Sequence, residues 1–554
     1  MKFSLAQLNY HIGNFSGNKD LICNAIKKAR SENAGLVIFS EMCVPGYPPL
    51  DLLDRIDFID KCSLTVDEIA KECRGITAVI GSPTINKNPD GKKLFNSALV
   101  LSEGKIIFSA NKALLPTYDI FDEYRYFEPE KKFSVFRFGD LSVALTICED
   151  LWDEQPFDNE FEKKRLYTVS PMDELARQSP DLIINISASP FSYTKIESKA
   201  GIFKGKAVKH KIPLITVNQT GANTELIFEG ASMLINGKGE ICRRLPFFEE
   251  AVETFSYEEI FSDTVRHREK KHEPVELIHK ALVTGIRDYF HKTNIEKAIL
   301  GLSGGIDSAL VLCLAVEALG NRNVRTLLMP SRYTSVHSVD DAVTLAERLC
   351  VQYDIISIEK PFKAFEEDLS LLFKGKETDV TEENIQARIR ALLLMATANK
   401  FGCILLNTSN KSEAAVGYGT LYGDMAGGLS VIGDVYKTDI YRLADHINRS
   451  GEIIPRSIIN KLPSAELKPN QFDTDSLPEY KILDSILYQY IELQKPADKI
   501  NGEGITGETV SKVLRMINAS EYKRFQSPPV LRISSKSFGQ GRRMPLVARY
   551  GNNR

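Results

Sequence analysis

The segment Ser303-Gly304-Gly305-Ile306-Asp307-Ser308 has the residue types of a loop that binds an oxyanion. It follows an apolar run at 297–302, which predicts a strand, and it precedes a helix-like run at 309–319. Glycines let backbone N–H groups approach an anion, and the start of the helix adds partial positive charge. No Lys follows the glycines, so the Walker pattern is absent, and the glycine spacing is not that of a dinucleotide-binding loop. Taken alone, the hexapeptide also fits a tight turn without a ligand.

Three other residues whose side chains could take part in catalysis each follow an apolar strand-like run. Glu41 comes after residues 35–40, Lys112 after 105–111 and Cys148 after 142–147. Ends of strands in one sheet can converge, so a thiol nucleophile, a carboxylate base and an ammonium that stabilises an oxyanion would meet. Each residue alone fits a plainer interpretation, because a Cys among apolar residues is usually a small core residue and lone charges are usually exposed.

Polar residues of the second half form two further groups. Residues 381–390 read as a helix with Thr381 as its N-cap, and Asn384 and Arg388 share one face of that helix. An amide beside a guanidinium suits a nucleotide's ribose, carboxylate or phosphate, although a solvated helix face explains the pair equally well. Residues 407–413 follow another apolar strand, so their side chains would lie at the ligand-facing edge of a sheet.

The elements that must position these residues change character along the chain. Up to about residue 260, short strands at 35–40, 77–81, 97–101, 142–147, 182–186 and 214–218 alternate with helical runs, which predicts an α/β layered sandwich. From about residue 275, longer helices separate strands at 298–302, 325–329, 352–358 and 403–408, which predicts a doubly wound parallel sheet. We therefore expect domains at 1–262 and 276–554, joined by a charged linker at 263–275.

Composition limits the class of protein. The chain has 554 residues, too many for one core, and its 43% hydrophobic and 26% charged residues are ordinary for a globular protein. A net charge of −3 argues against a general nucleic-acid surface, and no apolar run is long enough to span a membrane. The N-terminus lacks a signal peptide's apolar region, and the nine cysteines include no C-x-x-C pair. These features predict a cytoplasmic protein.

The motifs together resemble two known families. The segments that begin at Glu41, Lys112 and Cys148 resemble the Glu-Lys-Cys triad of the nitrilase (carbon–nitrogen hydrolase) superfamily. Residues 303–308 resemble the pyrophosphate loop of ATP pyrophosphatases. Residues 118–127, 381–390, 407–413 and 463–467 are similar to the glutamine-dependent NAD⁺ synthetase family, and this resemblance covers essentially the whole chain. It implies an α/β fold with an N-terminal α-β-β-α nitrilase-like sandwich and a C-terminal doubly wound sheet like that of adenine nucleotide alpha hydrolases.

The same resemblance implies the site residues. Glu41, Lys112 and Cys148 would be catalytic, while Tyr118, Ser189 and Lys195 would bind glutamine. The implied ATP-binding residues are Gly301, Leu302, Ser303, Gly304, Gly305, Ile306, Asp307, Ser308, Thr408 and Lys437. The implied deamido-NAD⁺-binding residues are Asn384, Arg388, Glu413 and Lys523. Asp307 and Glu413 would also hold Mg²⁺.

The implied reaction is amidation of deamido-NAD⁺ to NAD⁺ through an adenylated nicotinate. ATP and glutamine would be consumed, and AMP, pyrophosphate and glutamate released, by an enzyme that assembles as a homo-oligomer. Two alternatives remain open at this point. One is a related glutamine-dependent adenylating amidoligase with another acceptor, and the other is a degenerate nitrilase scaffold fused to an ammonia-dependent synthetase.

Overall fold

The computed structural model describes residues 1–154, 165–260 and 272–548, which form two compact units, 1–271 and 272–554. Of the expected linker at 263–275, residues 263–271 lie outside the described residues. Its last two residues belong to helix α5 (Pro274–Thr293), because a proline fits the first turn of a helix, where its missing N–H is not needed. Within the described residues, no helix combines the length and the apolar character needed to cross a membrane.

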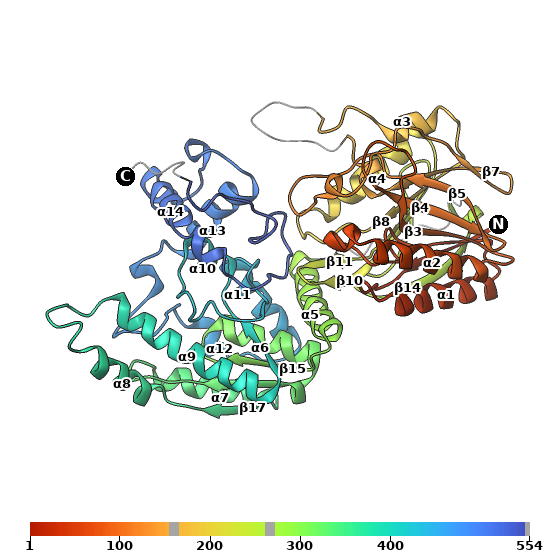
Figure 1. The fold of residues 1–554 in the computed structure, drawn as a ribbon. Helices are drawn as coiled ribbons and strands as arrows, with labels where there is room; N and C mark the ends of the chain where they lie inside the picture. Colours follow the sequence, from red (N-terminus) through yellow and green to blue (C-terminus); the bar gives the residue numbers. More distant parts are fainter. Residues whose placement is uncertain (155–164, 261–271, 549–554) are drawn as a thin grey trace. The chain divides into compact units, whose positions relative to one another are not determined.

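The first unit is built on two six-stranded sheets (Figure 1). One sheet has the strand order β14-β1-β2-β3-β4-β5, and its strands are β1 (Lys2–Gln7), β2 (Leu36–Ile38), β3 (Thr77–Ile85), β4 (Leu94–Ser102), β5 (Lys105–Asn111) and β14 (Ala251–Ser256). The other has the order β13-β12-β9-β8-β7-β6, and its strands are β6 (Phe136–Phe138), β7 (Leu141–Ile147), β8 (Leu182–Ser187), β9 (Leu214–Asn218), β12 (Met233–Ile235) and β13 (Ile241–Arg244). A separate hairpin pairs β10 (Thr220–Asn223) with β11 (Leu226–Glu229).

Three apolar layers hold these sheets. The central layer joins side chains of both sheets, such as Leu5 and Val79 from the first and Leu145 and Ile184 from the second. An outer layer packs α1 (Phe15–Ser31) and α2 (Ile56–Glu72) on the first sheet, and another packs α3 (Pro171–Ala176) and α4 (Ile196–His210) on the second. The inner strands β2, β8 and β9 are buried along their whole length and are largely apolar, whereas the edge strands β5 and β14 are partly exposed. The predicted α-β-β-α sandwich is confirmed.

The second unit contains a five-stranded parallel sheet with the order β17-β16-β15-β18-β19. Its strands are β15 (Lys297–Gly301), β16 (Val324–Leu328), β17 (Gln352–Ile355), β18 (Cys403–Asn407) and β19 (Leu429–Ser430). Its helices after α5 are α6 (Ile306–Leu319), α7 (Val336–Arg348), α8 (Glu359–Leu369), α9 (Val380–Phe401), α10 (Lys411–Val416), α11 (Lys437–Ile447), α12 (Arg456–Asn460), α13 (Tyr480–Leu487), α14 (Gly507–Ala519) and α15 (Glu521–Arg524). The predicted doubly wound parallel sheet is confirmed, and β19 is a strand that the sequence did not reveal.

The strand order places a ligand crevice between β15 and β18. The chain moves outward from β15 through β16 to β17 and then returns to the other side of β15 as β18. Right-handed connections then put α6 and α7 on one face of the sheet and α9 on the other. The loops that follow β15 and β18 diverge at this reversal point, which is where open α/β sheets bind ligands.

Helix α9 begins two residues earlier than the sequence suggested. Its N-cap is Asp379, whose carboxylate accepts the N–H of Thr381 at 2.8 Å. Glu382 reaches back to the N–H of Asp379 at 2.9 Å and so completes a capping box. The prediction of Thr381 as the N-cap was wrong. Asp379 lies two positions before Thr381, and Glu382 follows Asp379 by three positions, which is the spacing of a capping box.

Candidate active sites

Glu41 and Lys112 meet in the first unit, as predicted. Glu41 lies three residues beyond β2, and Lys112 directly follows β5. The Lys112 Nζ lies 2.8 Å from Glu41 Oε1, and both side chains are buried. Asn96 Nδ2 also donates to Glu41 Oε1 at 2.7 Å, and the Ala188 N–H donates to Oε2 at 2.9 Å. The carboxylate is thus held in one orientation by donors from three different segments.

Lys112 also pairs with a second carboxylate, which the sequence did not lead us to predict. Glu123, at the start of the short 3₁₀ helix η2 (Glu123–Arg125), lies 2.8 Å from the Lys112 Nζ and accepts the Tyr47 hydroxyl at 3.0 Å. Burial raises the pKa of Glu123 to about 7, while Lys112 acts in the opposite direction. Glu123 falls within residues 118–127, but a lone acidic residue in a loop carries no sequence signal of its own.

Cys148 directly follows β7 and opens the 3₁₀ helix η3 (Cys148–Leu151). The expectation that all three residues follow strands of one sheet was wrong, because β7 belongs to the second sheet and β2 and β5 to the first. Its φ of 41° lies in the left-handed region, which a non-glycine residue adopts only when its surroundings enforce it. Asp150 supplies that constraint, because its carboxylate accepts N–H groups of Ile147, Ala113 and Leu114 at 3.0 Å each. Burial raises the pKa of the Cys148 thiol, Glu41 raises it further and Lys112 lowers it. The thiol therefore needs a base, and Glu41 is close enough to influence it.

Two of the three predicted glutamine-binding residues lie around Glu149. The Tyr118 hydroxyl donates to Glu149 Oε1 at 2.8 Å, and the Tyr167 hydroxyl donates to the same oxygen at 2.9 Å. Burial raises the pKa of Glu149, while Lys195, the residue before α4, is one of the charges that lower it. Ser189 is positioned differently: its N–H donates to Asn218 Oδ1 at 2.9 Å, and it lines a separate small cavity of about 20 Å³.

The predicted anion loop in the second unit lies between β15 and α6. The Ser303 and Ser308 hydroxyls are 3.1 Å apart, and the Gly305 N–H donates to Ser303 Oγ at 3.2 Å. Gly304 has a φ of 78°, and a Cβ there would lie 2.2 Å from the Ser338 carbonyl oxygen in α7. Only glycine fits this position, so the loop can pack directly against the start of α7.

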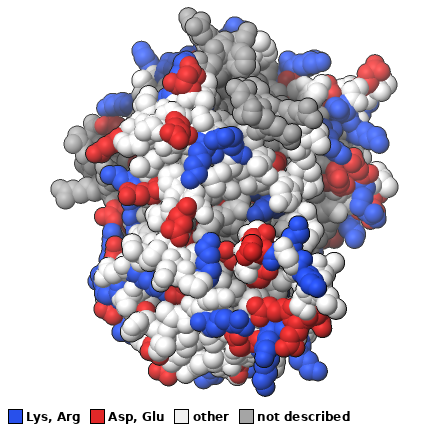
Figure 2. All heavy atoms as spheres, turned by 90° about the vertical axis from the view of Figure 1, so that its left-hand side faces the viewer, with Lys and Arg blue, Asp and Glu red and all other residues white. Residues whose placement is uncertain are grey.

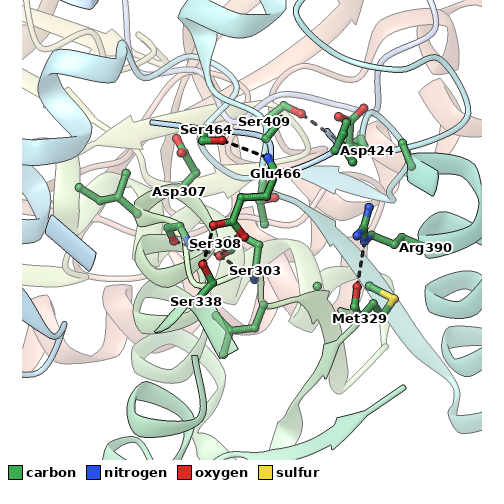
Figure 3. A pocket seen from close by; sticks show the side chains of 18 of the residues that line it. Ser303, Asp307, Ser308, Met329, Ser338, Arg390, Ser409, Asp424, Ser464 and Glu466 are labelled. Carbon is green, nitrogen blue, oxygen red and sulfur yellow. Dashed lines mark hydrogen bonds between the residues drawn. The ribbon is translucent and has the colours of Figure 1, made fainter. Parts of the chain in front are cut away.

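A cavity of about 310 Å³ opens beside this loop (Figure 3). The residues predicted to bind ATP that line it are Gly301, Leu302, Ser303, Gly305, Ile306, Asp307, Ser308, Thr408 and Lys437. Gly304 is not among the lining residues, because it faces α7. The cavity is also lined by residues 461–467 and by Asp424, which come from later loops of the unit.

Two carboxylates and one ammonium lie together in this cavity. Lys437 forms ion pairs with Asp307 and, at 3.6 Å, with Glu413, while Asn410 Nδ2 donates to Asp307 Oδ1 at 2.8 Å. Burial and the neighbouring Asp307 raise the pKa of Glu413 to about 8. Burial disfavours the charge on Lys437, but Asp307 and Glu413 raise its pKa overall. A pKa of about 8 leaves Glu413 largely protonated at neutral pH, and a cation bound between the two carboxyl groups would favour loss of that proton.

The other predicted deamido-NAD⁺ residues support a loop and do not line the cavity. Asn384 Oδ1 accepts the Thr420 hydroxyl at 2.7 Å, and Arg388 Nε donates to the Leu421 carbonyl at 3.3 Å. Lys523 Nζ donates to the carbonyls of Gly417 and Gly419 at 2.8 and 2.7 Å. All three hold residues 417–424, and that segment contributes Tyr418, Gly423 and Asp424 to the cavity wall.

Arg390 and Glu466 also line the cavity, and sequence reasoning missed both roles. Arg390 Nε donates to the Met329 carbonyl at 3.0 Å, and Glu466 accepts the Ser338 hydroxyl at 2.9 Å (Figure 3). The only sequence signal for Arg390 was its place two residues after Arg388, which turns it to another face of α9.

Figure 2 shows basic and acidic side chains interspersed over the face that it presents. The mixture fits a surface whose charges solvate the protein, while the buried charges described above are arranged in two specific groups.

Comparison with known proteins matches both halves of the chain. The carbon-nitrogen hydrolase family matches residues 2–266, and the NAD synthase family matches residues 278–527. The chain is 42% identical over 551 residues to the glutamine-dependent NAD(+) synthetase of Synechocystis sp., which covers 98% of each protein. It is 38% identical over 588 residues to the enzyme of that name from Thermotoga maritima, with 99% of each covered.

A solved structure extends this likeness to the fold. The glutamine-dependent NAD+ synthetase from Acinetobacter baumannii, determined in complex with adenosine diphosphate, has a TM-score of 0.77 at 35% identity. The match covers 99% of this chain and 98% of that one. These full-length likenesses show that the chain belongs to the glutamine-dependent NAD⁺ synthetase family.

Proposed function

We propose that this enzyme converts deamido-NAD⁺ to NAD⁺ with ammonia from glutamine, and that ATP is cleaved to AMP and pyrophosphate. The observation that carries the proposal is the presence of two different sites in one chain. The first holds Glu41 and Lys112 beside a cysteine, and the second holds an anion loop beside a 310 Å³ cavity. Full-length similarity to enzymes with this activity supports the same conclusion.

In the first site, the Cys148 sulfur attacks the carboxamide carbon of glutamine. Glu41 accepts the thiol proton and passes it to the departing nitrogen, so ammonia leaves and an acyl-enzyme thioester remains. Lys112 donates to the oxyanion of each tetrahedral intermediate. Glu41 then removes a proton from water, which attacks the thioester and releases glutamate and the thiol. Glu149, which accepts two tyrosine hydroxyls, offers an acceptor for the α-ammonium group of glutamine.

In the second site, a nicotinate carboxylate oxygen attacks the α-phosphorus of ATP. The bond to the bridging oxygen breaks, and pyrophosphate leaves into the loop formed by Ser303, Gly305 and Ser308. Ammonia then attacks the carbonyl carbon of the adenylate, AMP departs and the nitrogen loses a proton. The nucleophile must be NH₃, since ammonium has no lone pair, and exclusion of water protects the adenylate. Lys437 is placed to neutralise charge on the phosphates.

The residues of this site fit Mg²⁺ shared with ATP. Asp307 and Glu413 lie in the first turns of α6 and α10 and would supply oxygen ligands, and the raised pKa of Glu413 reflects their mutual repulsion as well as burial. No group of three or more metal-binding side chains occurs in the described segments, which suits an ion that keeps phosphate and water ligands. Bound there, Mg²⁺ would offset charge on the leaving pyrophosphate.

The residues proposed to shape the deamido-NAD⁺ site act mainly through one loop, residues 417–424. Asn384, Arg388 and Lys523 together fix residues 417–424, which form part of the cavity wall. In the proposed enzyme these three residues shape the dinucleotide site, and Glu413 contributes directly as a lining residue. The proposal also includes a cytoplasmic location and a homo-oligomeric state, which rest on the family resemblance and are checked by fractionation and by light scattering.

The test is a product assay with purified enzyme, deamido-NAD⁺ and ATP, in which glutamine or ammonium is the nitrogen donor. We expect NAD⁺, AMP and pyrophosphate in equal amounts with either donor, and glutamate only with glutamine. ADP formation would contradict the adenylation step. Absence of NAD⁺ with both donors would contradict the substrate assignment and favour another acceptor.

A further inference from the structure

Lys411 is a buried lysine at the first position of α10, and the described residues that line the cavity do not include it. Its ammonium group lies 2.9 Å from Asp434 and 2.8 Å from Glu492, and all three side chains are buried. Lys411 Nζ also donates to the Ser534 hydroxyl at 2.8 Å and to the Lys536 carbonyl at 2.9 Å. Burial disfavours the charge, but the two carboxylates raise the pKa of Lys411 overall.

The partners of this lysine come from segments that are far apart in the sequence. Asp434 lies in the loop before α11, Glu492 in the turn of π-helix that follows α13, and Ser534 in the last part of the described chain. Asp434 accepts the Ser534 N–H at 2.7 Å and its hydroxyl at 2.8 Å, and Glu492 accepts the Ser535 N–H at 3.2 Å. The cluster thus ties residues 533–536 to the start of α10.

The neighbours of Lys411 along the chain belong to the second site. Asn410, the residue before it, donates to Asp307 Oδ1 at 2.8 Å and caps α10 by accepting the Glu413 N–H at 2.9 Å. The other end of the cluster lies in the loop that precedes α11, whose first residue is Lys437. A displacement of Lys411 would therefore move Glu413 and Lys437 relative to Asp307.

Buried charge of this kind needs a reason other than stability. Taking charges out of water costs free energy, and a well-packed apolar residue often stabilises a protein as well as a buried ion pair does. Charge-assisted hydrogen bonds, however, fix distance and direction more strictly than apolar contacts. A cluster that joins several segments through such bonds suits a group that holds those segments in one arrangement.

We propose that Lys411 is a positioning residue for the second site, which fixes the starts of α10 and α11 to residues 533–536. The carboxyl groups of Asp307 and Glu413 and the ammonium group of Lys437 are thereby held at the spacing that ATP and Mg²⁺ require. The inference rests on the proposed function, because it takes ATP and Mg²⁺ as the ligands of these groups. It gives residues 533–536 a function in the ATP site, although the described residues that line the cavity do not include them.

The experiment compares Lys411→Met with the double variant Lys411→Met/Glu492→Gln in the full-length enzyme. The single variant leaves two buried carboxylates without their cation, so its urea midpoint should fall. The double variant removes one of these charges, and Asp434 keeps its N–H donors, so much of the stability should return. Calorimetric titration with ATP at a fixed Mg²⁺ concentration should nevertheless show about tenfold weaker binding in both variants.

Ammonium-driven NAD⁺ formation should fall by about 10²-fold in both variants, the scale of effect that follows a 1 Å misplacement. Ser534→Ala is a milder test, because it removes a hydroxyl that contacts both Lys411 and Asp434 while every charge stays. It should fold normally and bind ATP several-fold more weakly. Glutamate release should remain in all of these variants, because the first site is untouched.

The matched control is Lys206→Met in the first unit. Lys206 is also buried and pairs with two carboxylates, Asp153 at 2.6 Å and Glu154 at 2.8 Å. Its loss should lower the urea midpoint, while ATP binding and ammonium-driven synthesis stay within about twofold.

Two results would overturn the proposal. If the double variant regained stability and ATP affinity together, Lys411 would contribute stability alone. If Ser534→Ala bound ATP like the wild type, residues 533–536 would have no function in the site. ATP binding that weakens in these variants, in an enzyme that forms no NAD⁺, would contradict the proposed function and support the positioning role.

Discussion

The two sites hold their cationic side chains in different ways. In the first unit, Lys112 is already paired with Glu41 and Glu123, each at 2.8 Å, and all three side chains are buried. In the second unit, the Arg390 guanidinium makes one hydrogen bond, to a backbone carbonyl, among the described residues. The second site also contains a paired cation, Lys437 with Asp307 and Glu413, but only there does a second cation keep donors available for a ligand.

The most damaging change to the site of the first unit, where Lys112 is already paired with two carboxylates, should be Lys112→Met. It leaves two buried carboxylates without their cation, and loss of one partner of a buried ion pair costs about 3–5 kcal/mol. Glutamine hydrolysis should fall by roughly 10²–10³-fold, as expected when an oxyanion donor is removed. Glutamate release and urea denaturation measure the two effects. A stable variant that hydrolyses glutamine normally would contradict both roles assigned to Lys112, namely pairing with the buried carboxylates and stabilising the oxyanion.

A comparable test of the site in the second unit, beside the anion loop, is Gly304→Ala. The new Cβ would lie 2.2 Å from the Ser338 carbonyl, so the loop must move away from α7. Ammonium-driven NAD⁺ formation should fall by about 10²-fold, the scale of effect that follows a 1 Å misplacement, while glutamate release remains. Gly402→Ala is the matched control, because Gly402 also has positive φ, 64°, but nothing lies within 4 Å of its Cβ position. That control should lose only about 1 kcal/mol of stability.

The pH dependence of stability sharpens the contrast further. The folded pKa of Glu123 is about 7, against an ordinary value of 4.5. Between those values the folded chain holds a proton that the unfolded chain has released, so stability falls as pH rises through this window and is flat above it. Glu123→Gln should remove this slope, which is on the order of 1–3 kcal/mol between pH 5 and 8. Urea denaturation at the two pH values measures it, and an unchanged slope would show that Glu123 does not titrate there.

The smallest expected effect concerns a helix end outside both sites. Asp379→Ala should cost about 1 kcal/mol, because it removes the N-cap of α9, while Thr381→Ala should cost less than about 0.5 kcal/mol. Neither change should alter the kcat of either half-reaction, since the cap lies a full three turns from Arg390. If Thr381→Ala were the more costly of the two, the capping assignment would be reversed.

The sequence predicts those parts of the sites that follow directly from strand ends. Glu41, Lys112 and the loop at 303–308 were found because an apolar run pointed to each of them. Glu123 was missed because it comes from a loop, and Arg390 because its function depends on how α9 packs against β15 and β18. Lys523 shows the reverse case, since a motif identified it but its ammonium supports the backbone of another loop. Long-range packing decides such roles, and no local pattern records it.

The most direct test of the account compares Cys148→Ala with the wild type in NAD⁺ formation from deamido-NAD⁺ and ATP. We expect the variant to lose glutamine-driven synthesis by more than about 10³-fold, because the nucleophile is gone. Its ammonium-driven synthesis should remain within about twofold, because the second site does not use Cys148. Retained glutamine-driven synthesis would contradict the assignment of the nucleophile, and loss of both reactions would contradict two separable sites.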